Sequence, residues 1–267
     1  MRAKAYAARV ASTTVSVRRA DRLSAILDRV RADGNVDVTE LTASLGVSGA
    51  TVRRDLQSLA ENRMLVRTRG GAMSNDVGDE LPSRIKASRF QAEKRRIGEA
   101  AAGLVHDGAV VGLTGGSTAL EVARHLARRR GVTIVTNAID IAGKLAGNSG
   151  LRVVVIGGIL RSSQELVGPA AETMLSDYHL DIAFIGVDGL TPDEGCTTYD
   201  EMEAQTDLAF LRRSRRSVVI ADSSQLGKVT FARISPLSDV SDVVTDTGAD
   251  AEQLATPAAT GARIIAV

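Results

Sequence analysis

The chain has 267 residues, 44% hydrophobic and 24% charged, a composition that excludes a disordered or collagenous protein. Its single cysteine excludes an internal disulfide, and three histidines spread along the sequence (His106, His125 and His179) argue against a clustered metal site. We therefore expect neither a metal nor another cofactor. With three tyrosines, four phenylalanines and no tryptophan, the chain has too few rings for a protein that stacks single-stranded bases.

No run of the sequence approaches the ~20 apolar residues of a membrane-spanning helix, and the first residues hold no apolar stretch long enough for a signal peptide. We expect a cytoplasmic protein with no membrane partner. The net charge of +1 conceals a segregation: residues 1–75 contain 13 Lys and Arg against 7 Asp and Glu, and residues 76–267 contain 20 against 25. A basic front on a mildly acidic body suggests that the front binds a polyanion.

The front begins with a basic, acid-free stretch over residues 1–20, which we expect to be a disordered tail. Two helices are predicted next. The first follows Asp21, which can cap it, and ends at Gly34; the second is capped by Thr39 and is broken by Gly46. The apolar residues at helical spacing in these two helices are Leu23, Ile26, Leu27, Val30, Leu41 and Leu45.

A third helix is predicted after Ser48, which serves as its cap. Val52, Leu56 and Leu59 form one apolar stripe that must face a core. The opposite face suits the major groove of DNA, because small residues allow close approach while Arg and Gln offer bidentate hydrogen bonds to guanine and adenine. That face consists of Ala50, Arg54 and Gln57, flanked by Thr51, Arg53 and Ser58.

The segment MLVRTRGGA then alternates apolar and basic residues and ends in two glycines, which predicts a small β-hairpin. Residues 21–75 therefore form a winged helix-turn-helix, in which Arg67 and Arg69 contact the DNA backbone. The alternative for the arginines of the third helix is a solvated surface. We favour double-stranded DNA because the helix spacing, the charge segregation and the basic hairpin coincide. The predicted DNA-binding residues are Ser48, Ala50, Thr51, Arg53, Arg54, Gln57, Arg67 and Arg69.

One long spaced pattern in this front resembles a known family. It reads Arg22-x3-Ile26-x3-Val30-x17-Ser48-x2-Thr51-Val52-Arg53-Arg54-Asp55-Leu56, and it is similar to the signature of DeoR-type bacterial transcriptional regulators. Asp55 lies off the outward face, so we interpret it as an internal partner of a neighbouring arginine.

Residues 76–90 contain Pro82 and little apolar periodicity, and we take them as a linker to a body over 91–267. In the body, short Val- and Ile-rich runs alternate with helical stretches, which predicts an α/β fold with a doubly wound, mostly parallel sheet. The strand-like runs are AVVGL (109–113), TIVTN (133–137), VVVIGG (153–158), IAFIGVDG (182–189), SVVIAD (217–222), VVTD (243–246) and IIAV (264–267). The helical stretches are 91–105, one to about Arg129, one through Leu145, 170–178 and 201–213.

Ligands of such sheets collect at the carboxyl ends of the strands. There the loop TGGST, residues 114–118, lies between a strand and a helix, where backbone N–H groups bind anions. The alternative is a tight turn that needs glycine for its backbone angles. The loop lacks a Walker lysine, so we do not expect ATP hydrolysis. Polar residues end other strands too, at Asn137, Asp188 and Asp222.

The body also resembles the effector domain of the DeoR-type regulators, whose fold is similar to ribose-5-phosphate isomerase. The resemblance implies that Gly115, Gly116, Ser117 and Thr118 contact a phosphate, with Asn137, Asp188 and Asp222 near the sugar. Lys94 matches a basic position of the family. Where the family has a lysine after the strand that ends in Asp222, this chain has Gln225, and the next basic group is Lys228.

These observations predict a DNA-binding regulator, a repressor of sugar or polyol genes, that works as a homodimer or homotetramer and responds to a phosphorylated sugar or polyol. One alternative is a sugar-phosphate isomerase using Asp188, Asp193 and Glu194, but the Lys-Glu-Lys segment of those enzymes is missing. Another is a DNA-binding protein whose body only oligomerises. We expect no catalytic residue, and we interpret Cys196 as a small buried side chain rather than a nucleophile.

Overall fold

The computed structural model describes residues 19–61, 64–74, 90–251, 253–254 and 260–267. The chain divides into two compact units, Met1–Leu81 and Pro82–Val267. The predicted tail (1–20) and linker (76–90) fall almost entirely outside the described residues, so these boundaries stay predictions.

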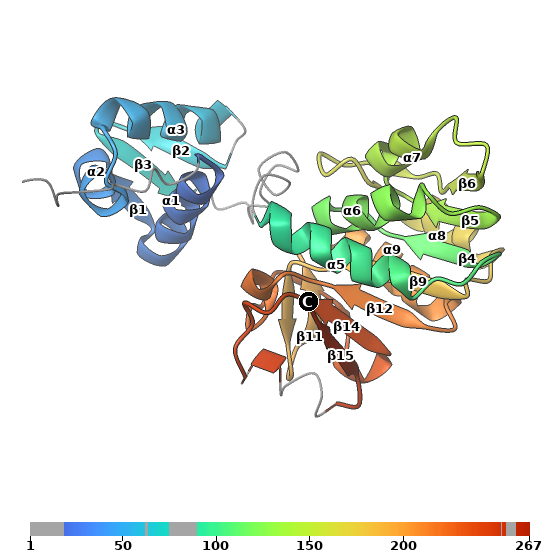
Figure 1. The fold of residues 1–267 in the computed structure, drawn as a ribbon. Coiled ribbons are helices and arrows are strands. Elements are labelled where there is room, and N and C mark those ends of the chain that lie inside the picture. The colour runs from blue at the N-terminus through green and yellow to red at the C-terminus, as the bar shows by residue number, and fades with distance from the viewer. Residues whose placement is uncertain (1–18, 62–63, 75–89, 252, 255–259) are drawn as a thin grey trace, which may run out of the picture. The chain divides into compact units, whose positions relative to one another are not determined.

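The first unit combines three helices with a small antiparallel sheet, shown in blue and cyan in Figure 1. Its sheet has the strand order β1-β3-β2, and β2 and β3 form the predicted hairpin. This arrangement of helices and hairpin is a winged helix-turn-helix, as predicted. The elements are α1 (Arg19–Asp33), β1 (Asn35–Asp37), α2 (Val38–Leu45), α3 (Gly49–Glu61), β2 (Leu65–Thr68) and β3 (Gly71–Ser74).

Two of the predicted helix caps are wrong. Asp21 lies inside the first turn of α1, where its charge favours the helix dipole instead of capping. The cap of α2 is Asp37, whose carboxylate accepts a hydrogen bond from the backbone N–H of Thr39. This hydrogen bond holds the pKa of Asp37 below its ordinary value. Gly46 ends α2 at φ 64°, as predicted.

The core of the first unit contains the residues predicted from helical spacing, including Leu23, Ile26, Leu56 and Leu59. A polar pair lies buried beside them. Asp55 is 2% exposed and accepts a hydrogen bond from Nε of Arg22 at 2.9 Å. Asp55 is therefore an internal partner of an arginine, as predicted.

The second unit is built on one seven-stranded parallel sheet, with strand order β15-β14-β12-β9-β4-β5-β6. All seven strand-like runs of the sequence are strands of this sheet. Their bounds are β4 (Val110–Leu113), β5 (Val132–Thr136), β6 (Leu151–Val155), β9 (Ile182–Gly186), β12 (Ser217–Ile220), β14 (Asp242–Thr245) and β15 (Arg263–Ala266).

Helices cover both faces of the sheet (Figure 1), as expected for a doubly wound fold. Side chains of one face of the strands, such as Val111, Ile134 and Phe184, pack with α5 and α6, while alternate ones such as Ala183 and Val219 belong to a second core with α8 and α9. The helices are α5 (Gln91–Gly103), α6 (Ser117–Leu126), α7 (Ile139–Leu145), α8 (Pro169–Ser176) and α9 (Glu201–Arg213), with two short 3-10 turns, η1 (Ser223–Gln225) and η2 (Leu237–Asp239).

Two smaller sheets were not predicted. A hairpin of β7 (Ile159–Leu160) and β8 (Leu166–Val167) follows β6, and its connection meets the end of β5 because the Ile139 N–H donates to the Gln164 carbonyl. A three-stranded antiparallel sheet joins β10 (Gly189–Thr191), β11 (Gly195–Thr198) and β13 (Ala232–Ser235). None of the described helices is long and apolar enough to cross a membrane.

Candidate functional site

The outward face of α3 carries the residues predicted to read DNA. The Ser48 hydroxyl accepts a hydrogen bond from the Thr51 N–H at 3.3 Å, so it caps the helix as predicted. Thr51 is half-buried. The predicted residues with exposed side chains on and next to the helix are Ser48, Ala50, Arg53, Arg54 and Gln57. The amide of Gln57 donates to Glu61 one turn later, at 3.0 Å.

The two arginines of the hairpin differ in exposure. Arg69 is exposed in the turn between β2 and β3. Arg67 is half-buried on the same side of β2 as the buried Leu65, and within the described residues its buried Nη1 has no hydrogen-bond partner. A buried guanidinium nitrogen favours a partner, so this atom of Arg67 is suited to a contact beyond those that the described residues supply.

In the second unit, the loop after β4 leads directly into α6. Gly116 has φ 99° and ψ 161°, a conformation that essentially only glycine adopts, and no side chain caps the helix that begins at Ser117. The space beside Gly116 is open, whereas a Cβ atom at Gly115 would overlap Cδ of Glu165. The uncapped end of α6 therefore lies next to an open position, as an anion site requires, and Thr118 is buried behind it.

The next strand, β5, is followed directly by a fully buried asparagine. The amide nitrogen of Asn137 donates to the Leu166 carbonyl at 3.2 Å, which ties β5 to the hairpin of β7 and β8. Its Oδ1 is buried and has no hydrogen-bond partner among the described residues. A buried acceptor without a donor is costly, so this atom is suited to a ligand hydroxyl or water.

Lys94 and Asp222, which the sequence predicted separately, form a buried ion pair. Nζ of Lys94 on α5 lies 3.6 Å from Oδ2 of Asp222, and both side chains are less than 10% exposed. Asp222 also caps η1, and the side chain of Gln225 completes the cap by accepting from the Asp222 N–H. The Gln225 amide donates in turn to the Val187 carbonyl. The residue in place of the family lysine thus bridges the ends of β9 and β12.

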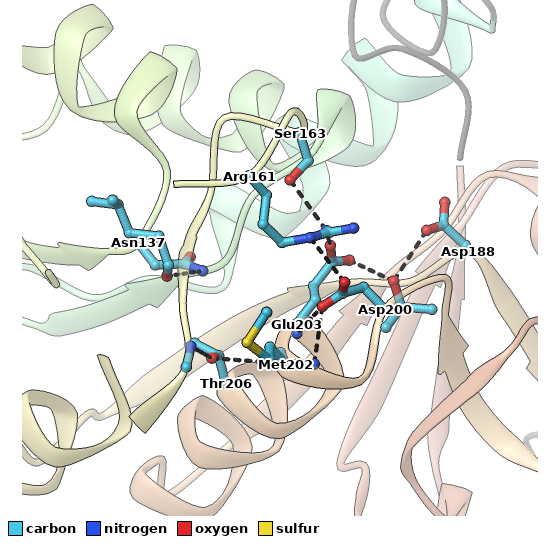
Figure 2. Close-up of polar contacts among 11 residues, drawn as sticks. Asn137, Arg161, Ser163, Asp188, Asp200, Met202, Glu203 and Thr206 are labelled. Atoms are coloured by element: carbon cyan, nitrogen blue, oxygen red, sulfur yellow. Dashed lines mark hydrogen bonds and ion pairs between the residues drawn. The ribbon is translucent and has the colours of Figure 1, made fainter. Parts of the chain in front are cut away.

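Asp188 belongs to a polar cluster that sequence reasoning missed (Figure 2). The Thr198 hydroxyl lies 3.2 Å from Oδ2 of Asp188 and 2.5 Å from Oε1 of Glu203, and it can donate its single proton to either carboxylate. Arg161, from the connection between β7 and β8, pairs with Glu203 and lies 3.3 Å from Asp200. No motif indicated this cluster, because its members come from a hairpin, a strand and the first turns of α9.

The carboxyl group of Asp207 lies fully buried on α9 behind that cluster. Burial raises the pKa of Asp207 well above its ordinary value, and the nearby carboxylates of Glu203, Glu165 and Asp188 raise it further. Arg161 opposes this rise. One oxygen of Asp207 has no hydrogen-bond partner among the residues that the structure describes. No group of three or more acidic, histidine or cysteine side chains in the described ranges is arranged to hold a metal.

The remaining predicted residues lie outside this cluster. Lys228 is exposed, and its carbonyl packs against Gly189, the residue after Asp188. Asp193 and Glu194 are exposed in the turn between β10 and β11. Cys196 is 1% exposed, and burial raises the pKa of its thiol to about 12, so it is a core side chain as predicted.

Comparison with known proteins identifies both units. Residues 22–77 match the DeoR-like helix-turn-helix domain, and residues 89–247 match the DeoR C-terminal sensor domain. The chain belongs to the DeoR family. It is a DNA-binding transcriptional regulator, as the sequence predicted.

Named relatives cover most of the DeoR-family chain. The HTH-type transcriptional repressor GlcR of Bacillus subtilis is 33% identical over 85% of this chain and 88% of its own. The glycerol-3-phosphate regulon repressor of Haemophilus influenzae is 32% identical over 80% of this chain and 84% of its own. These relatives are named as transcriptional repressors, in agreement with the prediction of a regulator.

Among solved structures, ribose 5-phosphate isomerase A of Methanocaldococcus jannaschii matches with a TM-score of 0.36 and 23% identity, over 51% of this chain and 54% of that chain. A likeness of this size supports no conclusion about the activity of this chain.

Proposed function

We propose that this DeoR-family regulator represses genes of sugar or polyol metabolism in the cytoplasm, and that a phosphorylated sugar or polyol changes its affinity for operator DNA. The name of the H. influenzae relative, a glycerol-3-phosphate regulon repressor, supports this class of target. The first unit reads the operator and the second unit holds the effector.

The DNA part of the proposal rests on the difference between the buried apolar face and the exposed polar face of α3. Val52 and Leu56 are fully buried on one side, while Arg54 and Gln57 are exposed on the other. Ala50 near the start of the helix leaves room for a base edge. An exposed helix with Arg and Gln beyond a small residue can enter the major groove and hydrogen bond to guanine and adenine.

The open end of α6 and the polar strand ends support the effector part. A phosphate beside Gly116 would accept hydrogen bonds from the first N–H groups of α6 and from the Ser117 hydroxyl. Asn137 and Asp188, at the ends of β5 and β9, would contact hydroxyl groups of the sugar. Lys94 of α5 would supply positive charge by exchanging Asp222 for the ligand phosphate.

A homo-oligomer follows from the size of the DNA contact. One recognition helix contacts only a few base pairs, and specific operators are read as paired half-sites. We therefore propose a homodimer or homotetramer, in which two first units bind one operator.

The DNA part is tested with an operator selected from random sequences. Arg54→Ala and Gln57→Ala should each lower the preference for operator over random duplex by about 1–3 kcal/mol at matched salt. Arg67→Ala should weaken binding to all duplexes about equally. Arg29→Ala is a matched control, because Arg29 is an exposed arginine of α1 that pairs with Asp33. An unchanged operator preference in Arg54→Ala would show that α3 reads DNA through another face.

The effector part is tested by calorimetry with a sugar phosphate and its unphosphorylated parent. Gly116→Asp should abolish binding of the phosphorylated ligand, because its carboxylate would lie in the anion position. Gly116→Ala carries the same backbone strain without the charge and is the matched control. The ligand should be recovered unchanged. Equal affinity for the parent sugar, or equal effects of the two substitutions, would exclude a phosphate at this loop.

A further inference from the structure

One cavity of the second unit lies at the opposite edge of the sheet from Gly116 and Asn137, the residues of the proposed effector crevice. It has a volume of about 680 Å³ and is lined by two turns, residues 127–132 and 148–152. These turns lead into the first residues of β5 and β6. Since β5 and β6 are parallel, their amino ends and carboxyl ends lie at opposite edges, so this cavity is separate from the effector crevice.

Hydrogen bonds fix the two turns to each other. The Gly131 N–H donates to the Gly150 carbonyl at 2.8 Å, and the Asn148 amide donates to the Ala127 carbonyl at 2.6 Å. The Asn148 oxygen accepts from the Gly150 N–H at 3.0 Å. The walls of the cavity are therefore held in place before any ligand binds.

Four arginines line this cavity, and none of its lining residues is acidic. Arg129 is anchored, because it lies 3.6 Å from Asp107 and donates to the Ala102 carbonyl. Arg128, Arg130 and Arg152 are exposed and form no ion pair with any residue in the described ranges. Such a concentration of positive charge is unusual in a body whose residues 76–267 carry more acids than bases.

A role in stabilising α6 accounts for only part of this charge. Arg128 and Arg130 follow the last residue of α6, Leu126, where positive charge interacts favourably with the helix dipole. Arg152 belongs to strand β6 and lines the same cavity. Arginines from two elements therefore line one cavity that has no acidic lining residue, an arrangement suited to a ligand with several negative charges.

We propose that this arginine cavity binds a small anion carrying two or more phosphate groups. A guanidinium group donates two parallel hydrogen bonds to a phosphate, and three unpaired arginines can serve more than one phosphate. The volume is within the range of pockets that enclose small molecules, about 300–1,000 Å³. The four arginines line a hollow between two turns, which favours a small polyphosphate over the backbone of a duplex. The site is independent of the proposed effector crevice.

The test is calorimetry of the full-length protein with inorganic tripolyphosphate. The wild type should bind it saturably, and the double variant Arg130→Gln, Arg152→Gln should bind it at least about tenfold more weakly. The matched control is Arg95→Gln, Arg212→Gln, which removes two exposed arginines of α5 and α9 that form no ion pair in the described structure. Thermal melting checks that both double variants fold, and Arg152→Gln alone provides a milder change.

Several results would overturn the proposal. These are the absence of saturable binding to the wild type, an equal loss of affinity in both double variants, and loss of tripolyphosphate binding in Gly116→Asp, which would place the probe in the effector crevice. A double variant that loses affinity for random duplex while keeping tripolyphosphate binding would identify a DNA-contacting surface instead. None of these outcomes bears on operator reading by α3.

Discussion

Removal of the Asp55 carboxylate distinguishes two roles that this acidic residue of α3 can have, a buried ion-pair partner that stabilises the first unit or a side chain that reads DNA bases. Asp55 is 2% exposed and Arg22 is 9% exposed, and their ion pair spans 2.9 Å. Asp55→Ala leaves a buried guanidinium group without this carboxylate, a change that typically costs about 3–5 kcal/mol. The free energy of unfolding of a domain of this size is about 3–5 kcal/mol.

Because this cost is comparable to the whole stability of the unit, we expect Asp55→Ala to unfold a substantial fraction of the first unit at 25 °C. Operator and random duplex should lose affinity in the same proportion, because only the folded fraction binds. Circular dichroism should show a loss of helix, and hydrogen exchange should locate it in α1 to α3. Glu40→Gln, at an exposed acid of α2, is the matched control and should change neither property.

A compensating variant makes the reasoning refutable. Arg22→Met together with Asp55→Leu replaces the buried pair by apolar groups, which is often neutral or stabilising, and should restore both helix content and DNA binding. If Asp55→Ala instead folded like the wild type and lost only its preference for operator, Asp55 would be a base-reading residue.

Three further predictions concern the second unit. Because the folded-state pKa of Asp207 is raised, its contribution to stability is present below about pH 4 and is lost as the pH rises through the folded-state pKa. The melting temperature of Asp207→Asn should therefore fall less than that of the wild type between about pH 5 and pH 8. Parallel pH profiles of the two melting temperatures would contradict a raised pKa of Asp207. Burial raises the pKa of Cys196 to about 12, so iodoacetamide should label it only after unfolding, and rapid labelling of native protein would refute this. Burial alone would raise the pKa of Asp242, but hydrogen bonds from Arg216 and Arg263 hold this pKa below its ordinary value. The contribution of Asp242 to stability is therefore present above about pH 4 and is lost in acid. In chemical denaturation, Asp242→Asn should lower the free energy of unfolding by about 1–3 kcal/mol at neutral pH, and this difference from the wild type should shrink at low pH.

The sequence predicted the fold wherever local patterns determine it. The apolar stripe of α3 and the Val- and Ile-rich strands led to the correct elements, because burial of one helix stripe and of both sheet faces leaves a direct trace in residue order. The cap of α2 was missed because Asp37 and Thr39 both have suitable side chains, and only the geometry shows which one accepts the hydrogen bond.

The candidate site was predictable only where polar residues end a strand. Asn137, Asp188 and Asp222 follow strands and were found in this way. Arg161 and Glu203 were not, because their pairing depends on how the hairpin of β7 and β8 meets α9, a contact between distant segments that no spacing rule encodes.

The coupling between the effector crevice and the DNA tests the account most directly. Operator binding of the wild type should be measured by fluorescence anisotropy at constant salt, with and without a panel of sugar and polyol phosphates and their unphosphorylated parents. The account predicts that at least one phosphorylated compound changes operator affinity by about 5–150-fold, that its parent does not, and that Gly116→Asp binds operator normally but no longer responds. An operator affinity that no phosphorylated compound changes, or a response that Gly116→Asp retains in full, would contradict it.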